Sequence, residues 1–479
     1  MRRLAAALFL SMVVTGATIY SACNDKKNNP EPSDGNYPPE ISDILIKKCA
    51  TSGCHTTASK DAAAGLDLST WDNLFLGTRN GAAAIPYRSD QSTLFYFVNT
   101  DTTLGITQLP TMPYNQTPLT TSEILTIRNW IDNGAPDKYG NIKFSDNPNR
   151  RKIYISNQGC DLVGVHDPVT RVVMRYVEVG NSPSIESPHQ IKLSPDGQYW
   201  YAIGIAGNFL QRYRTSDDAY VDEATIGFGY WNTFTISPDG TKAWVIDLNA
   251  NGRIAYVNLT TMSFVMYYTD PGMFSSPHGS FIDPTGHYLY VTNQLGNSVY
   301  KWDVSDPLLP SYDNIIINNS ATPADPHEIL FSPDGSKYFV TCQNLNQVRV
   351  MDVATDTLVA VIPTADYPLE MSISPSHGYL FVSCMTANSV TVIDINNLTA
   401  IKTIFTGYDP HGLVVDEQED VVYVANRNLP TSGGPPPHHI SECGGRNGYM
   451  TVIKMSSLEL EAGFKSELSV DPYSVILRN

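Results

Sequence analysis

One string recurs along the last two thirds of this 479-residue chain. Three copies are SPHGSFIDPTGHYLYVTN from Ser276, DPHEILFSPDGSKYFVTC from Asp325 and YPLEMSISPSHGYLFVSC from Tyr367. Each copy holds a short apolar strand, a turn like Pro-Asp-Gly, an aromatic strand, an Asn-rich turn and a third strand ending in Asp. A fourth strand precedes the next copy. The spacing of about 42–49 residues is that of a four-stranded propeller blade. Further copies start at Ser187, Trp231 and Asp409.

The first and last segments of the repeat region complement each other. The segment RKIYISNQGCDLVGVHD from Arg151 begins at a second strand, and the C-terminal DPYSVILRN from Asp471 matches the inner-strand string. Pairing the two would close the ring and leave no sheet edge bare. Six complete copies and one shared blade predict an all-β, seven-bladed propeller with this velcro closure over 149–479. The YVTN at Tyr290 resembles the YVTN-type propeller family, which includes surface-layer and redox proteins, and this resemblance indicates fold more than function.

The N-terminus has the order of a secretory signal peptide over residues 1–22. Two arginines precede a largely apolar stretch, and the small residues Ser21 and Ala22 precede Cys23. This order resembles the lipobox of bacterial lipoproteins, which implies a lipid on Cys23. The alternative is a plain signal peptide with an incidental cysteine. The polar, Pro-rich stretch that follows predicts a flexible tether over 23–39, and no later stretch is long and apolar enough to span a bilayer.

The string KKCATSGCHTT places Cys49, Cys54 and His55 close together. Two cysteines followed at once by histidine are the signature of covalent c-type haem attachment. In that chemistry the thiols bond the haem vinyl groups and the imidazole binds the iron. The gap holds four residues instead of the usual two, so the loop must bulge. A disulfide between the two cysteines and a zinc site are the alternatives, although no second Cys/His pair lies nearby to complete a zinc site.

Helical signals flank this motif. Apolar residues at helical spacing over 41–45 predict a short helix that leads into Cys49. Downstream, Thr120 and Glu123 form a capping box for a second helix, which Gly134 and a proline end. Between the helices lies a Met-Pro turn at Met112.

These pieces together resemble the c-type cytochrome domains of exported bacterial proteins. The resemblance implies a small all-α cytochrome c-like domain over 40–148, with one covalent haem c on Cys49 and Cys54. It also implies His55 as the proximal ligand of the haem iron and Met112 as the distal ligand. A thioether suits this position because it is a soft ligand that raises the potential. The alternative is that Met112 only fills a gap in the core.

Histidine follows proline at the start of four inner strands, where the other three blades align Asn232, Leu369 and Tyr473. We expect these imidazoles to ring one mouth of the central channel, and a swollen hairpin of the last blade to add two more. The candidate second metal site is therefore His189, His278, His327, His411, His438 and His439. Such a cluster resembles the copper-binding ring of nitrous-oxide reductase, which implies copper. The alternative is a repeat signature in which each imidazole hydrogen-bonds the backbone of a neighbouring blade.

The composition of the chain limits the classes of molecule that it could bind. A net charge of −17 disfavours nucleic acid and fits a cationic redox partner somewhat better. Cys160, Cys342, Cys384 and Cys443 are too far apart in sequence to indicate a disulfide framework. No nucleophile–base pair, phosphate loop or paired carboxylates argue for hydrolysis.

We therefore expect an exported lipoprotein, anchored to the outer membrane on its periplasmic or surface side, that transfers electrons to or from a protein or small molecule. An electron carrier is favoured over a full enzyme, and an oxidoreductase site at the propeller mouth stays open. The alternative is a non-catalytic surface scaffold whose haem domain is auxiliary.

Overall fold

A computed structural model describes residues 33–250, 252–270, 272–441 and 443–479. The signal peptide, Cys23 and most of the expected tether lie outside the described residues. Asp34–Asn479 form one compact unit. Within the described ranges, none of the helices is both long enough and apolar enough to cross a membrane.

The segment before the propeller contains short helices joined by loops. The α-helices are α1 Pro39–Ile44, α2 Trp71–Leu74, α3 Thr93–Val98 and α4 Thr121–Asp132. A π-helical turn, η1 Leu45–Cys49, continues α1, and 3-10 turns lie at η2 Lys60–Ala62, η3 Ser89–Gln91 and η4 Thr102–Leu104. The predicted capping box begins α4: the Thr120 hydroxyl accepts from the Glu123 amide at 3.3 Å, and the Glu123 carboxylate accepts from the Thr120 amide at 3.0 Å.

Aromatic residues hold this segment together. The indole of Trp71 donates to the carbonyl of Ala135 at 2.8 Å, and the rings of Tyr37 and Trp130 pack edge to face. The Tyr37 side chain is fully buried, and its hydroxyl donates to the carbonyl of Thr70 at 2.9 Å. The structure therefore differs from the expected tether over 23–39, because its last residues pack into this core.

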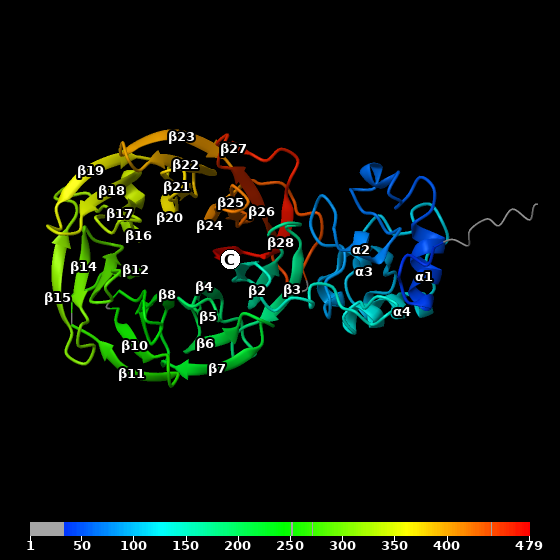
Figure 1. The fold of residues 1–479 in the computed structure, drawn as a ribbon, viewed down its shortest axis with the longest axis horizontal. Coiled ribbons are helices and arrows are strands. Elements are labelled where there is room, and N and C mark those ends of the chain that lie inside the picture. Colours follow the sequence, from blue (N-terminus) through cyan, green and yellow to red (C-terminus); the bar gives the residue numbers. More distant parts are fainter. Residues whose placement is uncertain (1–32, 251, 271, 442) are drawn as a thin grey trace, which may run out of the picture. The chain divides into compact units, whose positions relative to one another are not determined.

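The rest of the chain forms the predicted seven-bladed propeller, and Figure 1 shows its sheets arranged around a centre. Blade one contains β29 Pro472–Arg478, β1 Lys152–Asn157, β2 Leu162–His166 and β3 Val173–Glu178. Blade two contains β4 Pro188–Leu193, β5 Tyr199–Gly204, β6 Phe209–Arg214 and β7 Tyr220–Thr225. Blade three contains β8 Trp231–Ile236, β9 Lys242–Asp247, β10 Ile254–Asn258 and β11 Ser263–Tyr268.

Blades four to seven follow in the same order. Blade four contains β12 Pro277–Ile282, β13 Tyr288–Asn293, β14 Ser298–Asp303 and β15 Ser311–Ile316. Blade five contains β16 Pro326–Phe331, β17 Lys337–Cys342, β18 Gln347–Asp352 and β19 Leu358–Pro363, with the 3-10 turn η5 Gln343–Leu345 between β17 and β18. Blade six contains β20 Pro368–Ser374, β21 Tyr379–Cys384, β22 Ser389–Asp394 and β23 Thr399–Phe405. Blade seven contains β24 Pro410–Asp416, β25 Val421–Asn426, β26 Asn447–Lys454, β27 Glu459–Leu460 and β28 Ser466–Val470.

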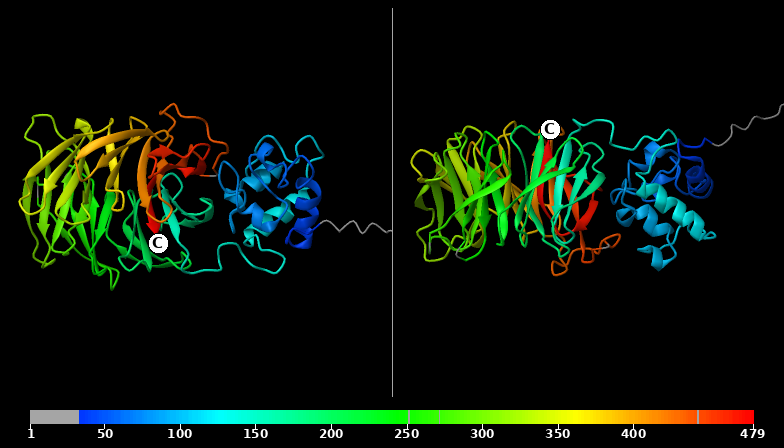
Figure 2. Two further views of the ribbon diagram at one scale, coloured as in Figure 1. Left: turned by 45° about the horizontal axis from the view of Figure 1, so that its top comes forward. Right: turned by 90° about the horizontal axis from the view of Figure 1, so that it is seen from below.

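The closure predicted from the sequence is confirmed. The C-terminal strand β29 pairs antiparallel with β1, with Lys152 opposite Arg478 and Tyr154 opposite Ile476. Figure 2 shows this last strand within the ring of blades. The first blade thus takes its inner strand from the end of the chain, so both ends of the repeat region are paired.

The inner strands begin with a common backbone geometry, which decides which of their residues face the channel. In six blades the residue before the first proline has positive φ, between 53° and 64°, at Ser187, Ser276, Asp325, Tyr367, Asp409 and Asp471. Just after this turn the pairing register shifts in every inner strand, for example between Pro277 and Ser280 and between Pro326 and Ile329. Such a bulge interrupts the strict alternation of faces along a strand. The residues after the proline are therefore re-aimed, and in this propeller they reach the channel.

Candidate functional site

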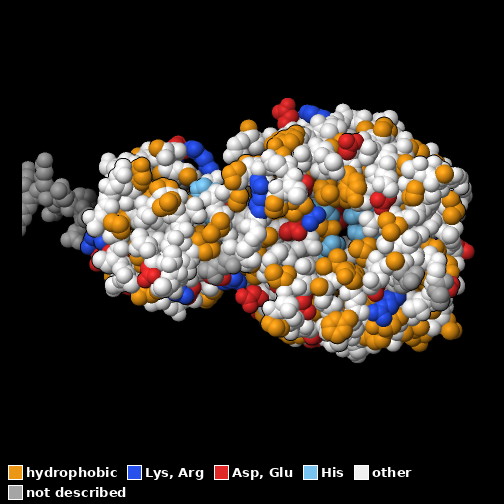
Figure 3. Space-filling view, turned by 180° about the vertical axis from the view of Figure 1, so that it is seen from behind, with side chains coloured by type: hydrophobic (Ala, Val, Ile, Leu, Met, Phe, Trp, Pro, Cys, Tyr) orange, Lys and Arg blue, Asp and Glu red, His pale blue; other side chains and the backbone are white. Residues whose placement is uncertain are grey.

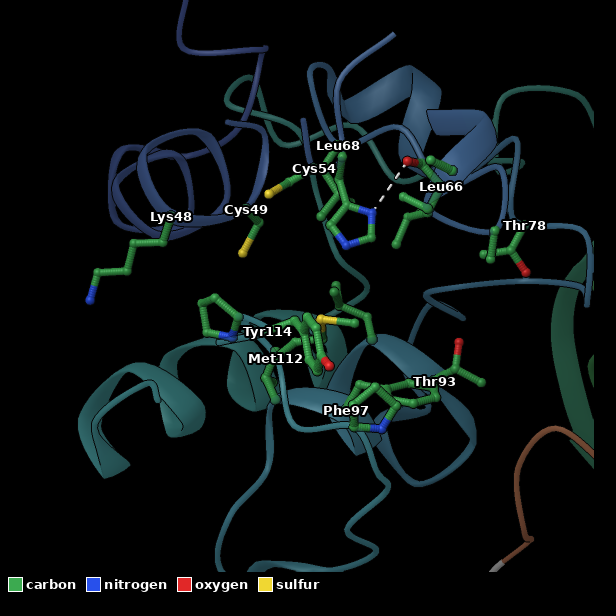
Figure 4. Close-up of a pocket in the computed structure, with 18 of the residues that line it drawn as sticks. Lys48, Cys49, Cys54, Leu66, Leu68, Thr78, Thr93, Phe97, Met112 and Tyr114 are labelled. Carbon is green, nitrogen blue, oxygen red and sulfur yellow. Dashed lines mark hydrogen bonds between the residues drawn. The ribbon is translucent and has the colours of Figure 1, made fainter. Parts of the chain in front are cut away.

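The Cys-Cys-His segment is held by its own backbone. After η1 the loop closes on itself, because the amide of Cys54 donates to the carbonyl of Thr51 at 2.9 Å and the amide of His55 donates to the carbonyl of Cys49 at 3.2 Å. The four-residue gap therefore does bulge, and it still leaves both thiols and the imidazole beside one space. The Nδ1 of His55 lies 3.4 Å from the carbonyl oxygen of Leu66, which the dashed line in Figure 4 marks.

Met112 faces this segment from the other side of that space. Its amide donates to the carbonyl of Phe97 at the end of α3, at 2.7 Å. The side-chain amide of Asn99 holds the loop before it, donating to the carbonyls of Gly105 and Ile106 at 3.2 and 3.0 Å. In Figure 4, Cys49 and Cys54 lie on one side of the space and Met112, Tyr114 and Phe97 lie on the other.

The space between these walls is a cavity of about 550 Å³. That volume is within the range of small-molecule and cofactor sites. Most of its lining is apolar, from Ala62, Ala63, Ala64, Leu66, Leu68, Leu94, Val98, Pro110 and Pro113. The sequence-predicted residues Cys49, Cys54, His55 and Met112 all line it.

Burial disfavours the charged forms of Cys49 and His55. Burial raises the pKa of the Cys49 thiol to about 12, and burial lowers the pKa of His55, against a smaller opposite effect of the Leu66 carbonyl. Cys49 and Cys54 are free thiols, so the alternative of a disulfide between them is not formed. Within the described ranges, the group of at least three side chains whose ligand atoms lie close enough for a metal ion contains neither these cysteines nor His55.

A propeller loop also reaches this cavity. The 427–446 loop, between β25 and β26, places His438 in the cavity lining, with its ring 5.4 Å from that of Phe97. His439 lies 5.9 Å from the ring of Tyr96 and its Nδ1 lies 2.9 Å from a carboxylate oxygen of Glu467. A disulfide between Cys160 and Cys443 fastens the same loop to the β1–β2 turn.

The other four candidate histidines do gather in the channel. Ring centroids are 6.2 Å apart for His189 and His278, 3.8 Å for His278 and His327, and 6.0 Å for His327 and His411. Tyr473 of β29 completes the circle, at 3.5 Å from His411 and 4.1 Å from His189. Figure 3 shows histidine atoms inside the hollow at the middle of the propeller.

The expectation that six histidines share one site is therefore corrected. His438 and His439 belong to the cavity of the Cys-Cys-His segment, because the disulfide at Cys443 and the carboxylate of Glu467 hold their loop there. The four remaining histidines come from inner strands, whose positions the repeat fixes.

Sequence reasoning missed two features of these sites. Spacing did not reveal the Cys160–Cys443 disulfide, whose partners are 283 residues apart. It also missed Glu328, which follows His327 directly and forms a group of metal-ligand geometry with His278 and His327. If successive side chains of β16 alternated strictly between the two faces of the sheet, Glu328 would lie on the face opposite to that of His327. The register shift in that strand was not readable from the sequence.

Comparisons with known proteins agree with the propeller. Residues 233–401 match the family model described as lactonase, 7-bladed beta-propeller. A curated relative, 6-phosphogluconolactonase of Cronobacter sakazakii, is 24% identical over 209 residues, which is 40% of this chain. The chain spans 61% of the length of that relative.

Two solved structures are similar to parts of the chain. A functionally unknown protein from Desulfotomaculum acetoxidans is 14% identical, with a TM-score of 0.52 over 67% of this chain and 99% of that one. Hydrazine synthase of Kuenenia stuttgartiensis is 19% identical, with a TM-score of 0.45 over 51% of this chain and 80% of that one. At this level of identity the first likeness concerns the fold alone.

Proposed function

We propose that this protein is an exported electron-transfer protein whose residues 40–148 are a c-type cytochrome domain with one covalent haem. One observation carries the proposal. A largely apolar cavity of about 550 Å³ has Cys49, Cys54 and His55 on one wall and Met112 on the other. Two thiols, an imidazole and a thioether around one cavity are the donor set of a six-coordinate c-type haem.

The residues present fit that group. Cys49 and Cys54 would hold it through thioether bonds, and both are free thiols in the protein alone. His55 would be the proximal ligand, and the carbonyl of Leu66 at its Nδ1 would orient the ring, as hydrogen-bond acceptors at the second ring nitrogen do for metal-binding histidines. Met112 would be the distal ligand, placed by the hydrogen bond that its backbone N–H donates to the carbonyl of Phe97.

The surroundings would tune the group's behaviour. A bound haem supplies reversible one-electron transfer at its iron. The apolar lining excludes water from most of the cavity, and a thioether ligand with a low surrounding polarity raises the reduction potential. His438 brings a polar side chain of the propeller to the same cavity. The propeller would therefore act next to the redox centre, as a docking or redox-active module.

Export and anchoring complete the proposal. The signal peptide and Cys23 support a lipoprotein at the outer membrane, and a partner that donates or accepts electrons would be a protein or a small molecule. The acidic composition favours a cationic protein partner.

The test is a pyridine haemochrome assay on the full mature chain, made in a host that attaches haem c. We expect one covalent haem per chain, lost in Cys49→Ser/Cys54→Ser and retained in Cys342→Ala, which removes a buried thiol far from the cavity. A mature wild-type chain without covalent haem would leave the scaffold alternative standing.

A further inference from the structure

We propose that the central channel of the propeller holds one divalent first-row transition-metal ion, bound by His278, His327 and Glu328. One ligand atom of each residue lies within 4.8 Å of the others. Metal bonds of about 2.0–2.2 Å to nitrogen and oxygen keep two ligand atoms within about 4.4 Å of each other, so at most a small movement of the side chains brings the three atoms to one ion. The site is separate from the proposed haem and does not depend on it.

The three side chains are deeply buried and incompletely paired. His278 and His327 are 3% exposed and Glu328 is 7% exposed. In the part of the chain that the structure describes, the Nδ1 atoms of both imidazoles and the Oε2 atom of Glu328 have no hydrogen-bond partner. A buried polar atom without a partner costs about 1–3 kcal/mol, and more if it is charged. Each of the three candidate ligands therefore carries a buried polar atom that a shared metal ion could satisfy.

The backbone is built to bring these atoms together. His278 enters from blade four, and His327 and Glu328 enter from blade five. The register shift after Pro326 lets both consecutive residues of β16 reach the channel. Gly279 allows the close approach of the two blades, because a Cβ at this position would lie 2.4 Å from the carbonyl oxygen of His327 and 2.7 Å from the Cα of Glu328.

The neighbouring groups orient the candidate ligands. The backbone of His327 lies beside the imidazole of His278, where it opposes the effect of burial on the pKa of that ring. A backbone carbonyl at the second nitrogen is the usual way in which a metal-binding histidine is oriented. The Nδ1 atom of His278 has no hydrogen-bond partner among the described residues.

Charge also favours a cation in the channel. The carboxyl groups of Glu328 and Glu370 both interact with the single ammonium group of Lys192. A divalent ion bound by Glu328 would add positive charge where two carboxyl groups share one ammonium.

Two imidazoles and one carboxylate are a donor set for zinc, ferrous and related ions, with an open coordination position. The rings of His189 and His411 lie next to the candidate ligands, 6.2 Å from His278 and 6.0 Å from His327 respectively, centroid to centroid. We therefore use Zn²⁺ as the probe and Cu²⁺ as the comparison, since copper was the ion implied by the histidine ring.

The experiment titrates the full mature chain, treated with a chelator and with whatever haem it carries, with Zn²⁺ by calorimetry and records zinc X-ray absorption of the complex. We expect one Zn²⁺ per chain and a first shell of nitrogen and oxygen. His327→Gln and Glu328→Gln should each weaken binding at least about a hundredfold, whereas His189→Gln, from the same ring, should change it less than about threefold. Haem content, measured separately, should be equal in all four proteins.

Three results would overturn the site. The first is a stripped wild-type chain that binds neither Zn²⁺ nor Cu²⁺ at micromolar concentration. The second is zinc binding unchanged in Glu328→Gln, which would place the ion elsewhere. The third is sulfur in the zinc shell, which would point to the cysteines. Because the X-ray spectrum is measured on the wild type, it decides the case even if a variant fails to fold.

Discussion

The imidazole rings of His278 and His327 lie 3.8 Å apart, centroid to centroid, although they belong to different blades. Both rings are buried, and burial lowers the pKa of His278 to about 4. Two imidazolium ions at this distance would repel each other strongly in a buried site. The protein therefore keeps a pair of neutral nitrogen donors where its inner strands converge. Blades four and five are neighbours in the ring, and their inner strands β12 and β16 pack directly against each other, which brings the two imidazoles together.

Replacing Met112 by alanine should remove the distal ligand and leave the haem attached. We expect the charge-transfer absorption of ferric iron with a thioether ligand to disappear, while the pyridine haemochrome yield stays that of the wild type. The potential should fall, because a thioether favours the ferrous state. Met351→Ala, a buried methionine of β18, is the control and should leave the spectrum unchanged. A Met112→Ala spectrum identical to that of the wild type would mean that Met112 is a core residue only.

Opening the Cys160–Cys443 disulfide should loosen the 427–446 loop and lower stability. The bond joins residues 283 apart in sequence, and a long closed loop gives a stabilisation of about 2–4 kcal/mol. We expect Cys160→Ala/Cys443→Ala to unfold at lower guanidinium concentration than the wild type, and a thiol reductant to shift only the wild type. Equal midpoints for the oxidised wild type and the double variant would contradict this prediction.

The repeat made most of the fold predictable, and local chemistry explains what remained hidden. Blade number and closure followed from copies of one string, because each copy must bury its face against the next. Aligned positions also predicted which four histidines share the channel. The predicted position of His438 was wrong because this residue lies in a long loop whose course does not follow from the repeat. The disulfide between Cys160 and Cys443 holds that loop at the β1–β2 turn. Glu328 was not predicted because a β-bulge interrupts the two-residue alternation of side chains between the faces of a strand, and the sequence prediction assumed that alternation.

Acid should destabilise the protein partly through His166, which is fully buried at the end of β2. Burial lowers its pKa from the usual 6.5 to about 3. Above pH 6.5 the imidazole is neutral in both states, and below it only the unfolded chain gains the proton. The contribution of His166 to the free energy of unfolding is therefore fully present above about pH 6.5. It is lost as the pH falls toward 3, by up to about 1.4 kcal/mol per pH unit.

His166→Phe should make the free energy of unfolding depend less on pH. We expect the loss of unfolding free energy between pH 7 and pH 5 to be about 2 kcal/mol smaller in this variant than in the wild type. Guanidinium unfolding at both pH values measures it. The control is His287→Gln, at an exposed turn residue, which should unfold with the pH dependence of the wild type. The same pH dependence in His166→Phe would show that His166 does not contribute to it.

The closing blade should depend on a buried ion pair between Lys152 and Asp218, whose atoms lie 2.8 Å apart. The ammonium also donates to the carbonyl of Thr215 at 2.6 Å, and the Tyr154 hydroxyl donates to Asp218 at 2.9 Å. Asp218 also lies 3.5 Å from the guanidinium of Arg175. Asp218→Asn removes the counter-ion of the buried Lys152 and of this arginine, so we expect a loss of about 3–5 kcal/mol in guanidinium unfolding. Lys152→Met/Asp218→Asn removes both charges and should recover most of it. The exposed pair of Arg214 and Asp217 is the control, and Asp217→Asn should cost at most about 1 kcal/mol. A double variant as unstable as Asp218→Asn would show that lost contacts, and not the unpaired charge, cause the effect.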